Sequence, residues 1–479
     1  MISIRFIRRR ASLAFASALL IAAGAAVAPA AASAADYVPG EVVVGYAPGA
    51  SASVSTDVAT RIGIGKRVGA PDPATQADPA THADPVTQVL RLPRGLSVTR
   101  ALARLRHERG IAYAVPNFIA HIAASGGPGW IPNDPGRTQV PGGWEALQWN
   151  FLPGEGVNAP QAWRNLIAVR RPGGRGVVVA VLDTGIAYRN WRSYGKSPDF
   201  KGTRFVAPYD FVAHDRYPLD RQGHGTFIAG TIAEATNNRL SLTGLAYGAT
   251  VMPVRVLDAD GSGDAARIAR GIRYATAHGA RVINLSLEFP PGTTLGDIPD
   301  VVSAIRFAHR RGVVLVAAAG NESAGHLAYP AAVSNVISVA ASTRDRCLAS
   351  YSNSGPGLDL VAPGGGDDAA LSSDPNCHPS RGLPTIYQLT LLSPSSPRQF
   401  GLPGGEDGTS FSAPHVAATA ALIIASGVLG RHPTPNQILA RLEATAQPLG
   451  GSKPNPTYGY GLVDAGAATA RASTAGRRR

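Results

Sequence analysis

Residues 408–418 have the sequence Gly-Thr-Ser-Phe-Ser-Ala-Pro-His-Val-Ala-Ala, and small apolar residues continue to position 425. The pattern predicts a buried helix over residues 410–425 that begins just after a glycine-bearing turn. Ser410 would then lie at the helix N-terminus, where unpaired backbone N–H groups and the positive end of the helix dipole favour a developing anion. From this segment alone, Ser410 is equally well explained as a helix N-cap.

Two upstream segments contain the acid and the base that a nucleophilic serine needs. Residues 176–186 (Gly-Val-Val-Val-Ala-Val-Leu-Asp-Thr-Gly-Ile) predict a buried strand, with Asp183 at the sheet edge where α/β proteins bind ligands. Residues 223–230 (Gly-His-Gly-Thr-Phe-Ile-Ala-Gly) place His224 at the start of a helix-like apolar segment. Taken singly, Asp183 is as well explained as a turn residue and His224 as a helix cap. Their order with the serine is one of the known orders of the acid–base–nucleophile triad.

A fourth segment supports the same chemistry. Residues 313–321 (Val-Val-Leu-Val-Ala-Ala-Ala-Gly-Asn) predict a buried strand that ends at a glycine and Asn321. Together the four segments resemble the signature blocks of the subtilisin-like serine peptidases (subtilases, peptidase family S8), and the resemblance extends over about residues 149–470. It implies that Ser410 is the nucleophile, His224 the general base and Asp183 the group that orients the base. Asn321 and the Ser410 N–H would stabilise the oxyanion.

The resemblance implies a secreted endopeptidase of broad specificity that cleaves polypeptides through an acyl-enzyme. It also implies a self-processed zymogen, a monomeric mature enzyme, and chemistry that needs no cofactor. The main alternative is a catalytically inactive, peptide-binding relative, which would need a damaged catalytic position, and all four positions are intact. A lipase-type hydrolase would have Gly-x-Ser-x-Gly at residues 408–412, which is absent. The related sedolisins lack the triad histidine, so the presence of His224 argues against that family.

The N-terminal third has the organisation of an exported precursor. Residues 1–35 are basic at the start, then apolar, then rich in small residues, which predicts a secretory signal peptide. Residues 36–123 resemble the inhibitory propeptide of the family, a small α+β domain, with a Pro-rich threefold repeat at residues 72–89 that predicts a loop. Its predicted elements are two strands, a helix and a final extended segment (41–46, 89–92, 98–109 and 111–122).

The remainder predicts the peptidase domain and its flanks. Residues 124–143 are rich in Gly and Pro, which predicts an exposed linker containing the processing site. Residues 144–472 alternate apolar strands with helices, so we expect an α/β fold: a parallel β-sheet flanked by helices on both faces. Residues 473–479 form a basic tail. The predicted strands are 251–257, 282–287, 313–318 and 336–340, and the predicted helices are 265–278, 299–311, 410–425 and 435–445.

Charge and cysteine content narrow the class further. The formal net charge is +13, but seven positive charges lie in the leader and the C-terminal arginines, and no dense basic block remains. We therefore expect no nucleic-acid partner, and no membrane association once the leader is removed. Cys347 and Cys377 are the two cysteines of the chain, and in an exported protein such a pair favours a disulfide.

The resemblance also places the substrate. Subtilases bind peptides as an added strand along two backbone segments, and the matching positions are Gly261-Ser262-Gly263 and Ser286-Leu287-Glu288. Glu288 departs from the glycine that is common in the family. Its carboxylate would crowd the pocket for the residue before the scissile bond (P1), attract a basic P1 side chain, or point into solvent.

Two further observations concern stability. Many relatives bind calcium, and the candidate oxygen donors here are Asp210, Asp215, Asn237 and Asn238, all of which are equally explained as solvated turn residues. Phe411 replaces the methionine that often follows the nucleophile. Oxidation of that methionine to its sulfoxide therefore cannot occur at this position.

Overall fold

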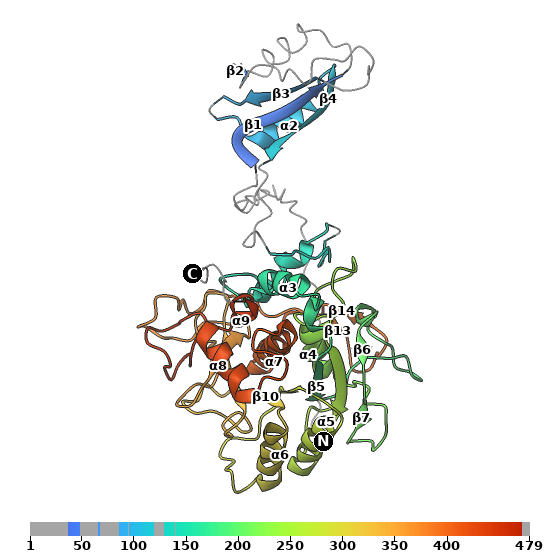
Figure 1. The fold of residues 1–479 in the computed structure, drawn as a ribbon, viewed down its shortest axis with the longest axis vertical. Helices are drawn as coiled ribbons and strands as arrows, with labels where there is room; N and C mark the ends of the chain where they lie inside the picture. Colours follow the sequence, from blue (N-terminus) through green and yellow to red (C-terminus); the bar gives the residue numbers. More distant parts are fainter. Residues whose placement is uncertain are drawn as a thin grey trace, which may run out of the picture. The chain divides into compact units, whose positions relative to one another are not determined.

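The computed structural model describes residues 37–47, 66–67, 86–93, 95–118, 129–138 and 140–471 (Figure 1). The predicted signal peptide and basic tail, and most of the Pro-rich repeat, lie outside these residues. The chain divides into two compact units, residues 1–127 and 128–479.

The smaller unit is a sheet covered by one helix. Its strands have the order β2-β3-β1-β4, and each neighbouring pair is antiparallel. Ala101 and Leu105 of the helix are fully buried in a core with Val42 and Val44. This arrangement confirms the predicted α+β domain, although the helix ends at Leu105 because a turn follows it. The elements are β1 (Tyr37–Tyr46), β2 (Lys66–Arg67), β3 (Val86–Arg91), α2 (Val98–Leu105) and β4 (Ile111–Phe118).

The larger unit is built on a parallel sheet, as the sequence predicts. Its strands have the order β12-β11-β10-β9-β5-β8-β6, and β7 also pairs with β8. Every pairing in this sheet is parallel. The strands are β5 (Val178–Asp183), β6 (Arg204–Phe205), β7 (Tyr209–Asp210), β8 (Thr250–Arg255), β9 (Val282–Leu285), β10 (Val314–Ala318), β11 (Ile337–Ser342) and β12 (Leu360–Pro363).

Helices cover both faces of this sheet because alternate residues of its strands point to opposite sides. In β5, Val179 and Val181 belong to one core, and Ala180 and Leu182 belong to the other. The first core also contains residues of α4 (His224–Ala233) and α7 (Thr409–Ser426); the second contains residues of α5 (Ala265–Ala277) and α6 (Pro299–Arg310) (Figure 1).

Helix α7 is the central helix of the first core. It contacts five strands of the sheet, and it is long and apolar enough to cross a membrane by length and composition. Since 89 % of it is buried inside the protein, its apolar character is explained by its place in the core.

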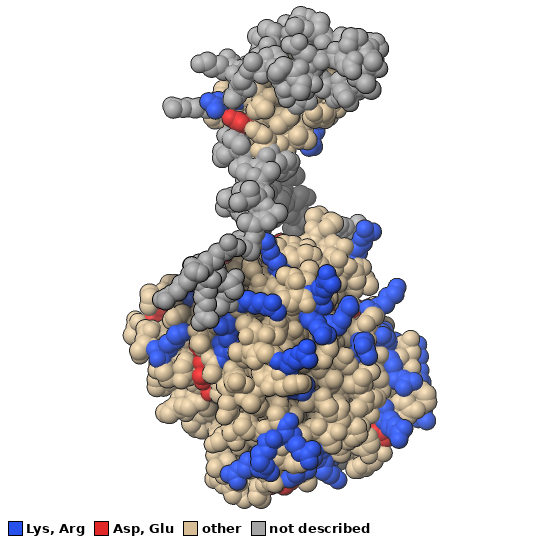
Figure 2. Space-filling model, in the orientation of Figure 1, with Lys and Arg blue, Asp and Glu red and all other residues tan. Residues whose placement is uncertain are grey.

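The remaining elements connect and cover this framework. Residues 129–138, which the sequence assigned to an exposed linker, pack on the larger unit: the Trp130 N–H donates to Pro160, and Asp134 is fully buried. Lys and Arg side chains are scattered over the face of the larger unit in Figure 2. The other elements are α3 (Ala159–Ala168), α8 (Pro435–Thr445), α9 (Ala465–Thr469), the hairpin strands β13 (Thr390–Leu391) and β14 (Phe400–Gly401), and the short 3-10 turns Gly143–Ala146, Trp149–Phe151, Pro172–Gly174 and Pro198–Phe200.

The predicted disulfide is present. Cys347 and Cys377 are bonded across a sequence separation of 30 residues. The bond attaches the start of the long connection over residues 364–408 to the segment that follows β11. The Thr390 hydroxyl in the same connection donates to the Gly223 carbonyl oxygen, just before α4.

Removal of this disulfide should destabilise the larger unit. A cross-link closing a loop of this length reduces the entropy of the unfolded chain, which corresponds to about 3–4 kcal/mol. We expect the double variant Cys347→Ala/Cys377→Ala to lose about that much free energy of unfolding in denaturant titration. The comparison belongs in a Ser410→Ala background, where autolysis cannot distort the curve. Two thiols alkylated without reductant in the parent protein would contradict the bond itself.

Candidate active site

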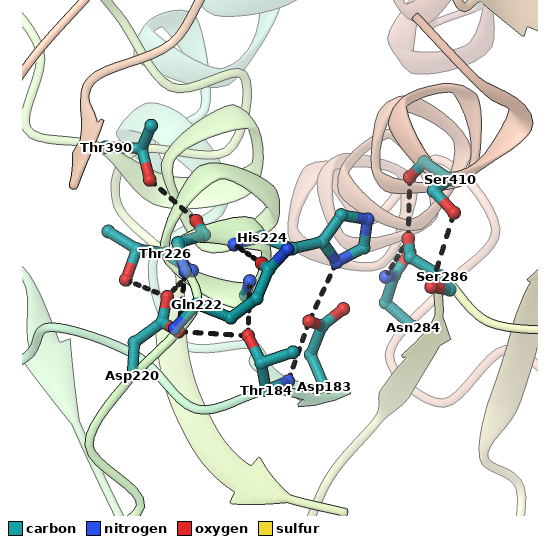
Figure 3. Close-up of polar contacts among 12 residues, drawn as sticks. Asp183, Thr184, Asp220, Gln222, His224, Thr226, Asn284, Ser286, Thr390 and Ser410 are labelled. Carbon is teal, nitrogen blue, oxygen red and sulfur yellow. Dashed lines mark hydrogen bonds and ion pairs between the residues drawn. The ribbon is translucent and has the colours of Figure 1, made fainter. Parts of the chain in front are cut away.

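Asp183 lies at the carboxyl end of the central strand β5 and is fully buried. Its Oδ1 accepts the Thr184 N–H at 2.7 Å and lies 2.8 Å from Nδ1 of His224 (Figure 3). A buried carboxylate at this distance fixes the orientation of the imidazole and favours the tautomer with the proton on Nδ1. The other carboxylate oxygen has no hydrogen-bond partner.

His224 is the first residue of α4, and a second buried carboxylate holds the start of this helix. Asp220 accepts backbone N–H groups of the α4 N-terminus together with two hydroxyl groups (Figure 3). An anion at this position accepts hydrogen bonds from the unpaired N–H groups and is stabilised by the positive end of the helix dipole. Asp220 was not among the residues that the sequence motifs indicated; its position four residues before the helix was the available signal. Its donors are the N–H groups of Gln222, Gly223 and Thr226 and the hydroxyls of Thr184 and Thr226.

The approach of α4 to β5 depends on the absence of a side chain at Gly225. A Cβ atom there would lie 2.1 Å from the Gly185 carbonyl oxygen and 3.1 Å from Asp183 Oδ1. The glycine after His224 therefore permits the imidazole to reach the carboxylate.

The electrostatic surroundings of His224 favour its charged form. Burial opposes charging, but the attraction of Asp183, and of Asp220 and Glu406 beyond it, outweighs burial and raises the pKa of His224. The side chain remains 21 % exposed, so the imidazole is open to the cleft. The Phe411 ring packs against it with ring centroids 5.4 Å apart.

Ser410 is the second residue of α7. The N-cap of this helix is Gly408, so the N-cap explanation of Ser410 is wrong. The Ser410 hydroxyl donates to the Ser286 carbonyl oxygen at 3.3 Å, and the Ser286 hydroxyl donates to the Ser410 carbonyl oxygen at 2.6 Å (Figure 3). Buried Asn284, which the sequence analysis also missed, donates to the Ser286 hydroxyl at 2.9 Å. The hydrogen bond expected between Ser410 and His224 is of a kind that often forms only when substrate is bound.

Asn321 lies beside the same helix start. Its Oδ1 accepts the backbone N–H of Thr409 at 2.8 Å and the Thr409 hydroxyl at 3.0 Å. Because the amide oxygen is occupied on the α7 side, the Nδ2 group is the donor left for another acceptor. In this structure Nδ2 lies 3.5 Å from Glu288 Oε1.

The two predicted substrate segments and two of the predicted catalytic side chains line one cleft of about 380 Å³. The larger cavity nearby, of about 740 Å³, is lined by other residues, although Pro290 borders both. The predicted chemistry belongs to the smaller cleft, because Ser410 and His224 line it. The lining residues named by the sequence analysis are His224, Gly261, Ser262, Gly263, Ser286, Leu287, Glu288 and Ser410.

The residues that the sequence suggested as oxygen ligands of a calcium ion fall into two groups. Asp210 forms a buried ion pair with Arg255 at 3.0 Å and also accepts the N–H groups of Val212 and Ala213, so it does not fit a cation ligand. Asp215 accepts the Tyr217 N–H.

The loop of Asn237 and Asn238 instead lies over buried acids. Its N–H groups donate to Asp134, and the Asn238 amide donates to Asp199 at 2.6 Å. Burial raises the pKa of Asp199 to about 7 and that of neighbouring Glu234 well above its usual range. Asp199 Oδ2 and Glu234 Oε1 are buried without a hydrogen-bond partner. Within the described residues, no group of three His, Cys, Asp or Glu side chains has metal-site geometry.

Comparisons with known proteins agree with this geometry. Residues 174–461 match the subtilase family (peptidase S8), and residues 23–117 match the fervidolysin N-terminal prodomain. A thermophilic serine proteinase of Bacillus sp. (strain AK1) is 31 % identical over 391 residues, which cover 82 % of this chain and 79 % of that protein. Thermitase of Thermoactinomyces vulgaris is 35 % identical over 298 residues, which cover 62 % of this chain and 88 % of thermitase.

A solved structure gives the same result. Proteases from Pseudoalteromonas arctica PAMC 21717 align with a TM-score of 0.56 and 30 % identity, over 71 % of this chain and 98 % of that one. The family match spans the parallel sheet, the cleft and all four positions discussed above. The chain therefore belongs to the subtilase family of serine endopeptidases and has an N-terminal prodomain.

Proposed function

We propose that this subtilase hydrolyses peptide bonds with Ser410 as nucleophile, His224 as general acid and base, and Asp183 as the group that orients the imidazole. The observation that carries the proposal is the 2.8 Å contact between His224 Nδ1 and buried Asp183, beside a cleft that also contains Ser410. An imidazole held in this way presents Nε2 to the cleft as the basic nitrogen.

The reaction then proceeds in two halves. A polypeptide lies along residues 261–263 and 286–288, whose backbone contacts make the specificity broad beyond P1. His224 takes the proton of Ser410 as the oxygen attacks the carbonyl carbon, and the oxyanion accepts hydrogen bonds from Asn321 Nδ2 and the Ser410 N–H. His224 returns the proton to the leaving amine, and water hydrolyses the acyl-enzyme by the same steps.

We further propose that the precursor processes itself and that the mature enzyme acts outside the cytoplasm as a monomer. The prodomain match and the relatives named above support this sequence of events. The N-terminal leader predicted by residues 1–35 is the export signal in this proposal.

Replacement of Ser410 tests the nucleophile and self-processing together. We expect Ser410→Ala to abolish casein cleavage and fluorophosphonate labelling, and to accumulate as a precursor that retains its N-terminal unit. Asn321→Ala should retain the fold and lose about 10²–10³ in kcat, a value adopted from the corresponding change in a subtilisin. Casein cleavage by Ser410→Ala at a rate near that of the parent would contradict the assignment.

The pH dependence tests the base. Because nearby carboxylates raise the pKa of His224, and the base must be neutral, activity should be lost as pH falls through a value above the ordinary pKa of 6.5. Glu406→Gln removes one attraction and should move the acid limb of kcat/KM to lower pH. Glu155→Gln, which removes an exposed carboxylate paired with Arg344, is the matched control and should leave the limb in place. An unshifted limb in Glu406→Gln would be the contrary result.

We also propose that a calcium ion stabilises the folded enzyme. The buried carboxylates of Asp199 and Glu234 would hold it, because each has an oxygen atom without a hydrogen-bond partner. The unpartnered oxygen of Asp199 and the raised pKa of this carboxyl support the site, since a cation would supply the missing positive charge. The ion would neutralise the buried acids and take no part in catalysis.

Chelation tests this site. In a Ser410→Ala background, calcium at 100 times its Kd should stabilise the protein by about 2.7 kcal/mol and raise Tm relative to EGTA. Asp199→Asn should lose most of that response, whereas Asp297→Asn, on an exposed loop, should keep it. Equal Tm values of the parent in calcium and EGTA would rule out the site.

A further inference from the structure

The position of the P1 side chain follows from the oxyanion donor, given the proposed peptidase function. The carbonyl oxygen of the attacked residue must lie next to Asn321 Nδ2. Glu288 Oε1 is 3.5 Å from that same nitrogen, and Glu288 lines the cleft with His224 and Ser410. The P1 side chain is attached to the Cα atom next to the attacked carbonyl carbon, and it therefore extends past the Glu288 carboxyl group.

The Glu288 carboxyl group is held in a site that lacks positive charge. Its Oε2 is buried without a hydrogen-bond partner, and it lies close enough to Gly320 that a Cβ there would be 2.9 Å away. Burial raises the pKa of Glu288 to about 7, and the negative charge of Glu322 raises it further in the same direction. Glu288 is therefore half-buried, with Oε2 turned inward toward Gly320 and Oε1 on the side of Asn321.

Glu322 brings a second carboxylate to the same place. Its Oε2 accepts the Asn353 amide at 2.6 Å. That amide nitrogen and Glu288 Oε2 both lie against Gly320, where a Cβ atom would be 2.1 and 2.9 Å from them. With a pKa of about 7, the Glu288 carboxyl group carries its proton part of the time near neutral pH in the free enzyme.

We propose that Glu288 and Glu322 form a P1 site for a cationic side chain, so that the enzyme cleaves preferentially after arginine or lysine. A guanidinium or ammonium group supplies donors to the unpartnered Oε2 and replaces the proton on Glu288, which is released to solvent. An uncharged P1 side chain leaves the buried carboxyl oxygen without a partner, which is unfavourable.

The proton release gives the preference a pH dependence. A cation competes with the proton on Glu288, so discrimination in favour of a cationic P1 group increases as pH rises through about 7. The groups that interact with Glu288 are the carboxyl group of Glu322 and the amide of Asn321. Titration of His224 affects all substrates alike and cancels in a ratio of kcat/KM values.

A matched pair of substrates tests the proposal. We compare two peptide p-nitroanilides that differ only in P1, arginine against citrulline, which has nearly the same shape and no charge. We expect kcat/KM for arginine to exceed that for citrulline about 10–100-fold at pH 8.5, the range of a charge-assisted hydrogen bond, and the ratio to fall toward pH 6. This measurement on the parent enzyme does not depend on whether a variant folds.

Variants then locate the effect. Glu288→Gln should reduce the arginine-to-citrulline ratio toward one and remove its pH dependence, and Glu322→Gln should reduce it in part. Asp260→Asn removes an exposed carboxylate beside the 261–263 segment and should leave the ratio unchanged, which excludes general attraction of cations to the cleft. Equal cleavage of both substrates by the parent, or an unchanged ratio in Glu288→Gln, would overturn the P1 proposal alone. Cleavage of neither would also overturn the P1 proposal, and loss of casein cleavage as well would overturn the proposed function.

Discussion

The contact between Asp183 and His224 is the interaction on which the rest of the site depends. It joins the end of the central strand β5 to the first residue of α4, two elements that pack against each other within one core. The 2.8 Å distance requires a glycine at position 225 and an anchored helix start, which Asp220 provides. The sheet, the helix and the carboxylate network together place one imidazole.

Buried negative charge without a full set of partners recurs in this protein. Asp183, Asp199 and Glu288 each have an oxygen that is buried and unpartnered. Burial of such groups is unfavourable for folding, so it persists where the group has a further use. In the proposed mechanism Asp183 would stabilise the imidazolium that forms during catalysis, and the proposed calcium and P1 cations would supply positive charge to the other two carboxyl groups.

The sequence predicted the fold well where apolar periodicity was strong. The helix expected over residues 410–425 is α7 (Thr409–Ser426), and the strand expected over residues 251–257 is β8 (Thr250–Arg255). Boundaries were less accurate where a turn follows a helix, as after Leu105. The packing of residues 129–138 was not foreseen, because a Gly- and Pro-rich composition predicts exposure and carries no information about long-range contacts.

By itself the sequence determined the parallel sheet, the order of Asp183, His224 and Ser410, and the family resemblance, because these depend on local pattern and on short motifs. Only the tertiary structure decided that Asp220 holds the start of α4, that Asn284 supports Ser286, and that Glu288 turns toward Glu322. Asp220 and Asn284 reach partners only two to six residues away, but Asp220 also accepts the distant Thr184 hydroxyl, and Glu288 and Glu322 lie on different connections. Their distances are set by the packing of sheet and helices, which no local pattern encodes.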